Sequence, residues 1–252
     1  MIITPKVRNN LCMNAHPVGC AREVQHQIDY IRGKPGFKGP KNAVIIGSST
    51  GYGLASRIAL AFGAGTATLG VFFEKESTET RTGTPGFYNN RAFETAAAEA
   101  GIKAESINGD AFSHEIKAEA VKRIKENLGS IDLVIYSLAS PVRVDPDTGE
   151  MYRSVLKPLE GTYSAKAVNA MTGEVTEASI EPATQKELED TVKVMGGEDW
   201  KLWIKAFKDA GVLSDGAISV AYSYIGPDLT YPIYRAGTIG KAKEHLENSA
   251  SE

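Results

Sequence analysis

The stretch from Val44 to Ala55, Val-Ile-Ile-Gly-Ser-Ser-Thr-Gly-Tyr-Gly-Leu-Ala, constrains the fold more than any other. Its β-branched start is typical of a buried strand, which stops at Gly47. Gly51 and Gly53 follow at GxxxGxG spacing, and residues 54–62 are small or apolar at helical period. A strand, a glycine turn and a helix start suit the pyrophosphate of a dinucleotide, because the backbone can lie close to it with free N–H groups. The alternative is a glycine turn that serves only packing in another α/β domain.

The composition is that of an ordinary globular protein, with 42% hydrophobic and 23% charged residues among 252. The formal net charge of −3 gives no general attraction to nucleic acid or to an anionic membrane, so local groups must hold any phosphate-bearing ligand. No apolar run reaches membrane-spanning length, and residues 1–6 lack the apolar region of a signal peptide. We therefore expect a cytoplasmic protein that binds neither nucleic acid nor membrane.

Cys12, His16 and Cys20 lie four residues apart, a spacing compatible with metal binding. However, Pro17 interrupts the helix that would align them, and no fourth ligand is near in the sequence. Two cysteines are also too few for a disulfide framework. We predict no metal site and expect buried or partly buried thiols.

Apolar strands and amphipathic helices alternate along the chain. The pattern predicts strands at 44–46, 67–73, 103–107, 131–136 and 217–222, helices at 17–31, 54–62, 91–100 and 113–128, and a long loop at 76–90. This order predicts an α/β protein with a doubly wound parallel sheet, a Rossmann-like fold.

Candidate ligand groups follow the predicted strands. Glu74 ends the second strand, roughly 20 residues after the glycine turn, where such folds place a carboxylate that accepts from the adenosine ribose. A carboxylate there repels a 2′-phosphate, which favours NADH over NADPH; the alternative is a solvated acid at a strand end. Asp110 can accept from an adenine amino group, with the small Ala111 beside it, although Asp before a helix is also a common N-cap. Leu138 and Ala139 follow the fourth strand, at the edge where doubly wound sheets bind ligands.

Residues 140–182 break the alternation. Turn signals at 145–149 and 171–173 predict a β-hairpin of 162–168 with 174–180, inserted beside the mouth of the active site. Helices are predicted near 185–195 and 200–210. We interpret residues 1–252 as one dinucleotide-binding and catalytic domain, with an N-terminal helical extension (1–41) and this insertion.

Tyrosines and lysines near the C-terminus suggest a catalytic acid, a tyrosine, with a nearby cation, a lysine, that assists it. A phenol, with a pKa of about 10, stabilises charge poorly unless a cation is close, and lysine supplies one. Tyr234 and Lys243 are nine positions apart, so at about 100° per residue one continuous helix would point them to opposite faces. Tyr234 should therefore precede a helix that begins near Thr238, a suitable N-cap. Lys241 is the competing candidate, because its offset of seven would share the face of Tyr234 in a continuous helix.

Five stretches together resemble FabV-type trans-2-enoyl-CoA/enoyl-[acyl-carrier-protein] reductases of the short-chain dehydrogenase superfamily. The stretches are 47–53, 71–75, 136–140, 221–227 and the Tyr234-x8-Lys243 pair. The resemblance runs along essentially the whole chain, and the Tyr-x8-Lys spacing is specific to that group. Members of the family continue past this point, so the chain looks C-terminally short, without the segment that would complete the cofactor site.

The resemblance implies NADH-dependent reduction of trans-2-enoyl thioesters, enoyl-CoA or enoyl-acyl-carrier-protein, in fatty-acid biosynthesis. It implies that Tyr234 stabilises the thioester oxygen, that Lys243 holds the nicotinamide ribose and supports Tyr234, and that Tyr224 contacts the substrate. It implies the following cofactor-binding residues: Gly47, Ser48, Ser49, Thr50, Gly51, Tyr52, Phe73, Glu74, Asp110, Ala111, Leu138, Ala139 and Lys243.

Two other functions stay open at this stage. The chain can be a different short-chain dehydrogenase that acts on a ketone or alcohol, or an NADH-binding fragment without turnover. The sequence does not give acyl length, and we expect a monomer.

Overall fold

The computed structural model describes residues 4–8, 11–12, 14–138, 140–169, 171–224 and 226–251. Contacts within the chain divide it into two compact units. The first unit comprises residues 1–138 and 206–222, and the second unit comprises residues 139–205 and 223–252. The interpretation of the whole chain as one domain stays a prediction.

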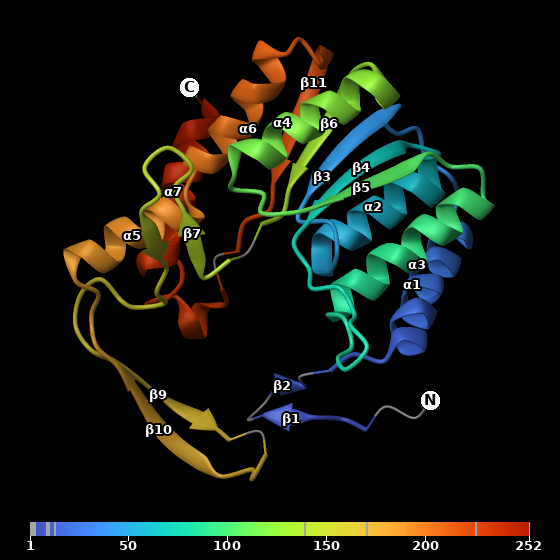
Figure 1. The fold of residues 1–252 in the computed structure, drawn as a ribbon. Helices are drawn as coiled ribbons and strands as arrows, with labels where there is room; N and C mark the ends of the chain where they lie inside the picture. Colours follow the sequence, from blue (N-terminus) through green and yellow to red (C-terminus); the bar gives the residue numbers. More distant parts are fainter. Residues whose placement is uncertain are drawn as a thin grey trace. The chain divides into compact units, whose positions relative to one another are not determined.

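A five-stranded parallel sheet forms the centre of the first unit (Figure 1). Its strands are β3 (Asn42–Ile46), β4 (Ala67–Phe72), β5 (Ala104–Asn108), β6 (Ile131–Tyr136) and β11 (Leu213–Ala221), in the spatial order β11-β6-β3-β4-β5. The order runs outward from β3 in both directions, so β3 and β6 flank the point where the winding reverses. The predicted doubly wound parallel sheet is confirmed.

Helices pack on both faces of this sheet. Helices α1 (Pro17–Arg32), α2 (Gly51–Ala64) and α3 (Pro85–Glu99) lie together on one face, and α4 (His114–Arg123) lies on the other (Figure 1). Every residue of β3 is buried, as expected for a strand covered on both faces. The core between α1, α2 and α3 is formed by Val24, Ile28, Leu54, Ile58, Ala61 and Phe93. The helix predicted from Pro17 is thus confirmed, and it packs on α2 and α3.

The N-terminal residues form a short antiparallel ladder between β1 (Val7–Arg8) and β2 (Leu11–Cys12). His16 is the N-cap of α1, and its Nδ1 accepts a hydrogen bond from the backbone N–H of Gly19 (3.1 Å). Cys20 is partly buried, as expected, whereas Cys12 is exposed. The expectation of a buried or partly buried thiol is wrong for Cys12, which lies exposed in this two-residue ladder.

Helix α3 begins six residues before the predicted helix, inside the stretch predicted as a loop. Pro85 occupies its first turn, where a fixed φ and a missing N–H are tolerated. The buried face of the helix includes Asn90, whose polarity hides the apolar period in the sequence. The amide oxygen of Asn90 has donors inside the unit: its Oδ1 accepts from the Arg57 guanidinium (2.9 Å) and from the Ser106 hydroxyl (3.0 Å).

Arg57 of α2 is a fully buried cation that joins α2 to its neighbours. Its ring contact is with Phe93 of α3, 4.4 Å from the guanidinium carbon to the ring centroid. Its four hydrogen-bond acceptors are Thr68 Oγ1, Asn90 Oδ1, Ser106 Oγ and the Glu105 carbonyl oxygen. Burial lowers the pKa of Arg57 to about 10.

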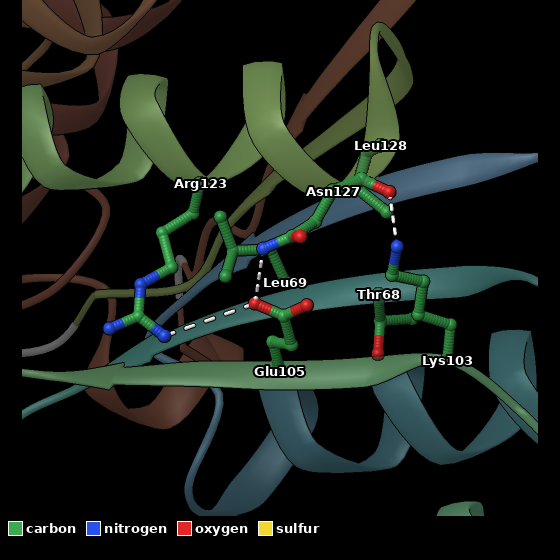
Figure 2. Close-up of a pocket in the computed structure, with 7 residues that line it drawn as sticks. All are labelled: Thr68, Leu69, Lys103, Glu105, Arg123, Asn127 and Leu128. Atoms are coloured by element: carbon green, nitrogen blue, oxygen red, sulfur yellow. Dashed lines mark hydrogen bonds and ion pairs between the residues drawn. The ribbon is translucent and has the colours of Figure 1, made fainter.

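The predicted helix 113–128 is present as α4, with Ser113 as its N-cap, followed by a π-helix at Ile124–Leu128. Figure 2 shows the corner where this π-helix meets β5: Asn127 Nδ2 donates to Glu105 Oε2 (2.9 Å), and Arg123 forms an ion pair with the same oxygen (3.9 Å). Lys103 Nζ donates to the Asn127 carbonyl. These contacts lie near the amino ends of β4 and β5. They therefore attach the π-helix to the edge of the sheet opposite the carboxyl ends of the strands, where the glycine turn lies.

The second unit contains two antiparallel hairpins and two packed helices. The hairpins are β7 (Val142–Val144) with β8 (Met151–Arg153), and β9 (Tyr163–Val168) with β10 (Val175–Ile180). The helices are α5 (Gln185–Met195) and α7 (Thr238–Ser251), and a 3-10 turn, η2, covers Asp228–Thr230. Helix α6 (Glu198–Asp209) continues from the second unit into the first. The predicted β9–β10 hairpin is confirmed, whereas β7–β8 was not predicted.

Within the described part of the chain, no helix combines the length and the hydropathy needed to cross a membrane.

Replacing Arg57 by Met should lower the free energy of unfolding by about 3 kcal/mol, because buried acceptors lose their donor. Arg123→Met is the matched control: that side chain is partly exposed and pairs with Glu119 at the surface, so its loss should cost less than about 1 kcal/mol. Urea denaturation followed by circular dichroism measures both. Equal losses for the two variants would show that the buried network contributes nothing special.

Candidate functional site

The glycine turn between β3 and α2 brings backbone segments into direct contact. Gly47 has a φ of +87°, and a Cβ there would collide with the Ser137 carbonyl at the end of β6. A Cβ at Gly53 would collide with the Gly47 carbonyl. Ser48 is fully buried, and both its N–H and its hydroxyl donate to the Val71 carbonyl of β4. Only glycine fits at positions 47 and 53, so the sequence motif reflects close packing of the turn against β6 and α2.

The first turn of α2 is left without a side-chain cap. Thr50 is its N-cap residue, but within the described chain the Thr50 side chain makes no capping hydrogen bond. Gly51 has a φ of +54°, and a Cβ built there would meet none of the described atoms within 4 Å. Open space above uncapped N–H groups at the positive end of a helix dipole suits an anion such as a pyrophosphate.

Glu74 lies beside this turn, two residues after β4. The Ser49 hydroxyl donates to its Oε1 (2.7 Å), so the predicted ribose-binding acid is in direct contact with the glycine turn. Two aromatic side chains next to these residues are largely exposed, Tyr52 at 76% and Phe73 at 74%. The structure therefore brings together Glu74 and the turn, both at the carboxyl edge of the sheet.

Asp110 and Ala111 lie in the loop after β5. The Asp110 carboxylate accepts from the Phe112 N–H (2.9 Å), whereas the N-cap of α4 is Ser113, whose hydroxyl accepts from the Ile116 N–H. Asp110 is therefore a turn residue and not the N-cap. Ala111 is buried, and its carbonyl accepts from the Lys117 ammonium (2.9 Å).

Leu138 follows β6, and its Cδ2 lies 3.3 Å from where a Cβ of Gly47 would sit. Ala139, also predicted to line the nucleotide, lies outside the described residues. One further side chain of the first unit belongs to this edge. Tyr222, after β11, hydrogen-bonds the Ser56 hydroxyl (2.5 Å), and its ring lies 5.7 Å from that of Tyr52. The sequence pattern alone assigned no role to Tyr222, although its place directly after a strand is a signal for a residue at this edge.

Tyr234, in the second unit, precedes α7 as predicted. Its carbonyl accepts from the N–H groups of Gly237 (3.1 Å) and Gly240 (2.8 Å), which fixes its backbone at the helix start. Its ring stands edge-to-face against Tyr224, 5.1 Å between centroids. Gly226 has a φ of +73°, and a Cβ there would lie 2.9 Å from Cγ of Tyr234, so glycine is required for this packing.

Thr238 is the first residue of α7 and not its cap. Its hydroxyl donates to the Val155 carbonyl (2.5 Å), and its N–H donates to the Lys157 carbonyl (3.0 Å). The prediction of Thr238 as N-cap is wrong because a segment distant in the sequence takes its hydroxyl.

The two candidate lysines of α7 differ in their surroundings. Lys241 is exposed and forms an ion pair with Glu244 (2.8 Å). Lys243 is partly buried, and among the described residues it has no hydrogen-bond or ion-pair partner. Burial lowers the pKa of Lys243 from its ordinary 10.5. Lys243 is therefore the cation available to a ligand, and Lys241 is the surface residue.

The parallel sheet with an uncapped glycine turn at its carboxyl edge defines a Rossmann-type protein. Residues 2–79 match the family described as the NAD(P)H binding domain of trans-2-enoyl-CoA reductase, and residues 81–252 match the trans-2-enoyl-CoA reductase catalytic region. The chain belongs to the trans-2-enoyl-CoA reductase family.

Two curated relatives are similar along this chain. One from Edwardsiella ictaluri, named enoyl-[acyl-carrier-protein] reductase [NADH], is 58% identical over 252 residues, covering 100% of this chain and 64% of the relative. One from Treponema denticola, named trans-2-enoyl-CoA reductase [NADH], is 56% identical, covering 99% of this chain and 64% of the relative. The crystal structure of Treponema denticola trans-2-enoyl-CoA reductase in complex with NAD matches with a TM-score of 0.94 and 54% identity, over 100% of this chain and 64% of that chain. The chain thus spans just under two thirds of their length.

Replacing Lys243 by Met should raise the free energy of unfolding at pH 7, because it removes a partly buried charge that has no partner in the described part of the chain. The pKa of Lys243 is lower in the folded state than in the unfolded state. The loss of stability caused by the buried charge is therefore fully present below the folded-state pKa, and it disappears as the pH rises from that value toward 10.5. Urea denaturation at pH 7 and near pH 10 measures this difference. Lys241→Met, at the exposed and paired lysine, should give no gain; a Lys243→Met variant less stable than wild type at pH 7 would contradict the assignment.

Proposed function

We propose that the chain carries out NADH-dependent reduction of trans-2-enoyl thioesters to acyl thioesters, in fatty-acid biosynthesis. The observation that carries the proposal is that the second unit holds both a backbone-fixed Tyr234 directly before α7 and, on α7, a partly buried Lys243 that has no partner among the described residues. The names of the relatives from Edwardsiella and Treponema, at 58% and 56% identity, support the same reaction.

The first unit fits a dinucleotide. The uncapped first turn of α2 and the open space above Gly51 suit the pyrophosphate, and Glu74 suits the adenosine ribose. NADH, when bound, supplies the hydride that the β-carbon of the enoyl thioester receives. The residues that would hold it are Gly47, Ser48, Ser49, Thr50, Gly51, Tyr52, Phe73, Glu74, Asp110, Ala111, Leu138, Ala139 and Lys243.

Tyr234 and Lys243 handle the charge that develops on the substrate. Hydride addition to the β-carbon would leave an enolate whose negative charge gathers on the thioester oxygen, and the Tyr234 hydroxyl would donate a hydrogen bond or its proton to that oxygen. Protonation of the α-carbon, with the proton coming ultimately from water, would then give the acyl thioester. Lys243 would hold the nicotinamide ribose. Its positive charge would make the Tyr234 hydroxyl a better donor to the thioester oxygen. Tyr224, edge-to-face with Tyr234, is the second substrate contact and restricts the position of the reactive ring.

The substrates are enoyl-CoA or enoyl-acyl-carrier-protein, and the protein acts as a cytoplasmic monomer that binds neither nucleic acid nor membrane. The shared chemistry of the two substrates is the thioester, and Tyr234 needs only its oxygen. Initial rates with crotonyl-CoA and with a long-chain enoyl thioester, each with NADH and with NADPH, test the proposal. NADH binding without oxidation would indicate a non-catalytic fragment, and turnover of a ketone panel instead would indicate another dehydrogenase.

Tyr234→Phe should abolish crotonyl-CoA reduction, a loss of roughly 100-fold or more in kcat, because the ring keeps its packing but loses its donor. NADH affinity, measured by nicotinamide fluorescence, should remain near that of wild type. Tyr231→Phe is a matched control, since this tyrosine lies nearby in the same unit without an assigned role. Unchanged turnover of Tyr234→Phe would remove the phenol from the mechanism.

Glu74→Ala should narrow the preference for NADH over NADPH, because the carboxylate that accepts from a 2′-hydroxyl and repels a 2′-phosphate is lost. The ratio of the NADPH dissociation constant to the NADH dissociation constant should fall by about tenfold. An unchanged ratio would mean that this acid does not contact the ribose.

A further inference from the structure

The backbone of Glu74 is held beyond the end of its strand by one side chain. Strand β4 ends at Phe72, which pairs with Asn108, the last residue of β5. The Asn108 amide then continues the pairing: its Oδ1 accepts from the Glu74 N–H (3.0 Å), and its Nδ2 donates to the Glu74 carbonyl (3.0 Å). A side-chain amide thus takes the place of a peptide group, so Glu74 keeps a strand-like position where the loop has already begun.

The carboxylate of Glu74 is held separately, between the glycine turn and the first turn of α3. Ser49 donates to Oε1 (2.7 Å), and Ser49 is itself anchored by Asn89 Nδ2, which donates to its carbonyl (3.2 Å). A Cβ at Gly86 would collide with Oε1 of Glu74 and lie 2.8 Å from the Ser49 hydroxyl. The described residues offer no hydrogen bond to Oε2. One oxygen is therefore fixed, and the other is available to a ligand.

Fixing this carboxylate matters for selectivity. A glutamate that rotates freely can turn away from a 2′-phosphate at little cost, and it must lose rotamer freedom to bind a 2′-hydroxyl. A glutamate held by its backbone, by Ser49 and by the space at Gly86 repels the phosphate without relaxing and accepts from the hydroxyl without ordering.

We infer that Asn108 and Gly86 are positioning residues for cofactor selectivity, which act on the adenosine ribose through Glu74. This inference rests on the proposed dinucleotide site. Neither residue needs to touch the cofactor: Asn108 fixes the backbone of Glu74, and Gly86 leaves the volume that its carboxylate occupies.

Gly86→Ala tests the inference with little risk to the fold. Gly86 lies in the first turn of α3 with no positive φ, and alanine has the higher helix propensity. The added methyl group must move the Glu74 carboxylate, which is the flexible end of a side chain. The ratio of the NADPH to the NADH dissociation constant, from nicotinamide fluorescence, should fall by about tenfold. Gly19→Ala in α1 is the matched control, because its Cβ would meet its nearest neighbours at 3.6 Å or more, and the ratio should not change.

Asn108→Ala provides a second, independent test, with Asn127→Ala as control. Both variants remove an amide, but that of Asn127 bonds Glu105 near the amino end of β5. Asn108→Ala should lower the selectivity ratio, and Asn127→Ala should not. In a Glu74→Gln background, Gly86→Ala and Asn108→Ala should no longer change the ratio, because the charge they position is gone.

The outcomes separate the inference from the proposed function. A wild-type chain that binds neither dinucleotide overturns the proposed site and the inference with it. A wild type that prefers NADH, with Gly86→Ala and Asn108→Ala variants that keep this preference or weaken both cofactors equally, overturns the inference alone. A wild type that binds both cofactors equally also overturns it.

Discussion

The first unit depends on the contact between backbone segments at the glycine turn. Gly47 packs on the Ser137 carbonyl and Gly53 on the Gly47 carbonyl, without room for a side chain at either position. This contact lets α2 start after a turn of only four residues at the end of β3, the strand that lies between β4 and β6. Its first N–H groups consequently face the edge where the parallel strands end, and the acid after β4 reaches the turn through Ser49. The geometry of the proposed phosphate site thus follows from a packing constraint.

Polar side chains of the first unit form hydrogen bonds that the sequence pattern does not reveal. Strands β3, β4 and β6 could be predicted because each is a short apolar run, and β6 was found with its observed limits, Ile131–Tyr136. The polar start of β11 was missed, so that strand begins at Leu213 and not at the predicted residue 217. The start of α3 could not be predicted, because Asn90 sits on the buried face and becomes intelligible only with Arg57 as its donor. The role of Asn108 could not be predicted for a similar reason, because its partner is the backbone of Glu74, beyond the end of β4. Side-chain-to-backbone pairs between distant segments leave no periodic signal.

The second unit was predicted where local geometry decided the outcome. A nine-residue spacing cannot place Tyr234 and Lys243 on one helix face, and Tyr234 does precede α7. Burial then distinguishes Lys243 from Lys241, a choice that the family resemblance implied but that helical geometry alone left open. Thr238 was misassigned because its hydroxyl bonds Val155, far away in the chain, and the β7–β8 hairpin was missed because three-residue strands are too short for a pattern.

The first unit is discontinuous in the chain, which has a consequence for its synthesis. Strand β6 pairs with β3 on one side, but its other neighbour, β11, comes only after residues 137–212 have been made. During translation, at roughly 5–20 residues per second, the nascent sheet therefore carries an open edge at β6 for several seconds. Until β11 is made, the unpaired N–H and C=O groups of this edge can pair with another chain, so aggregation competes with completion of the sheet.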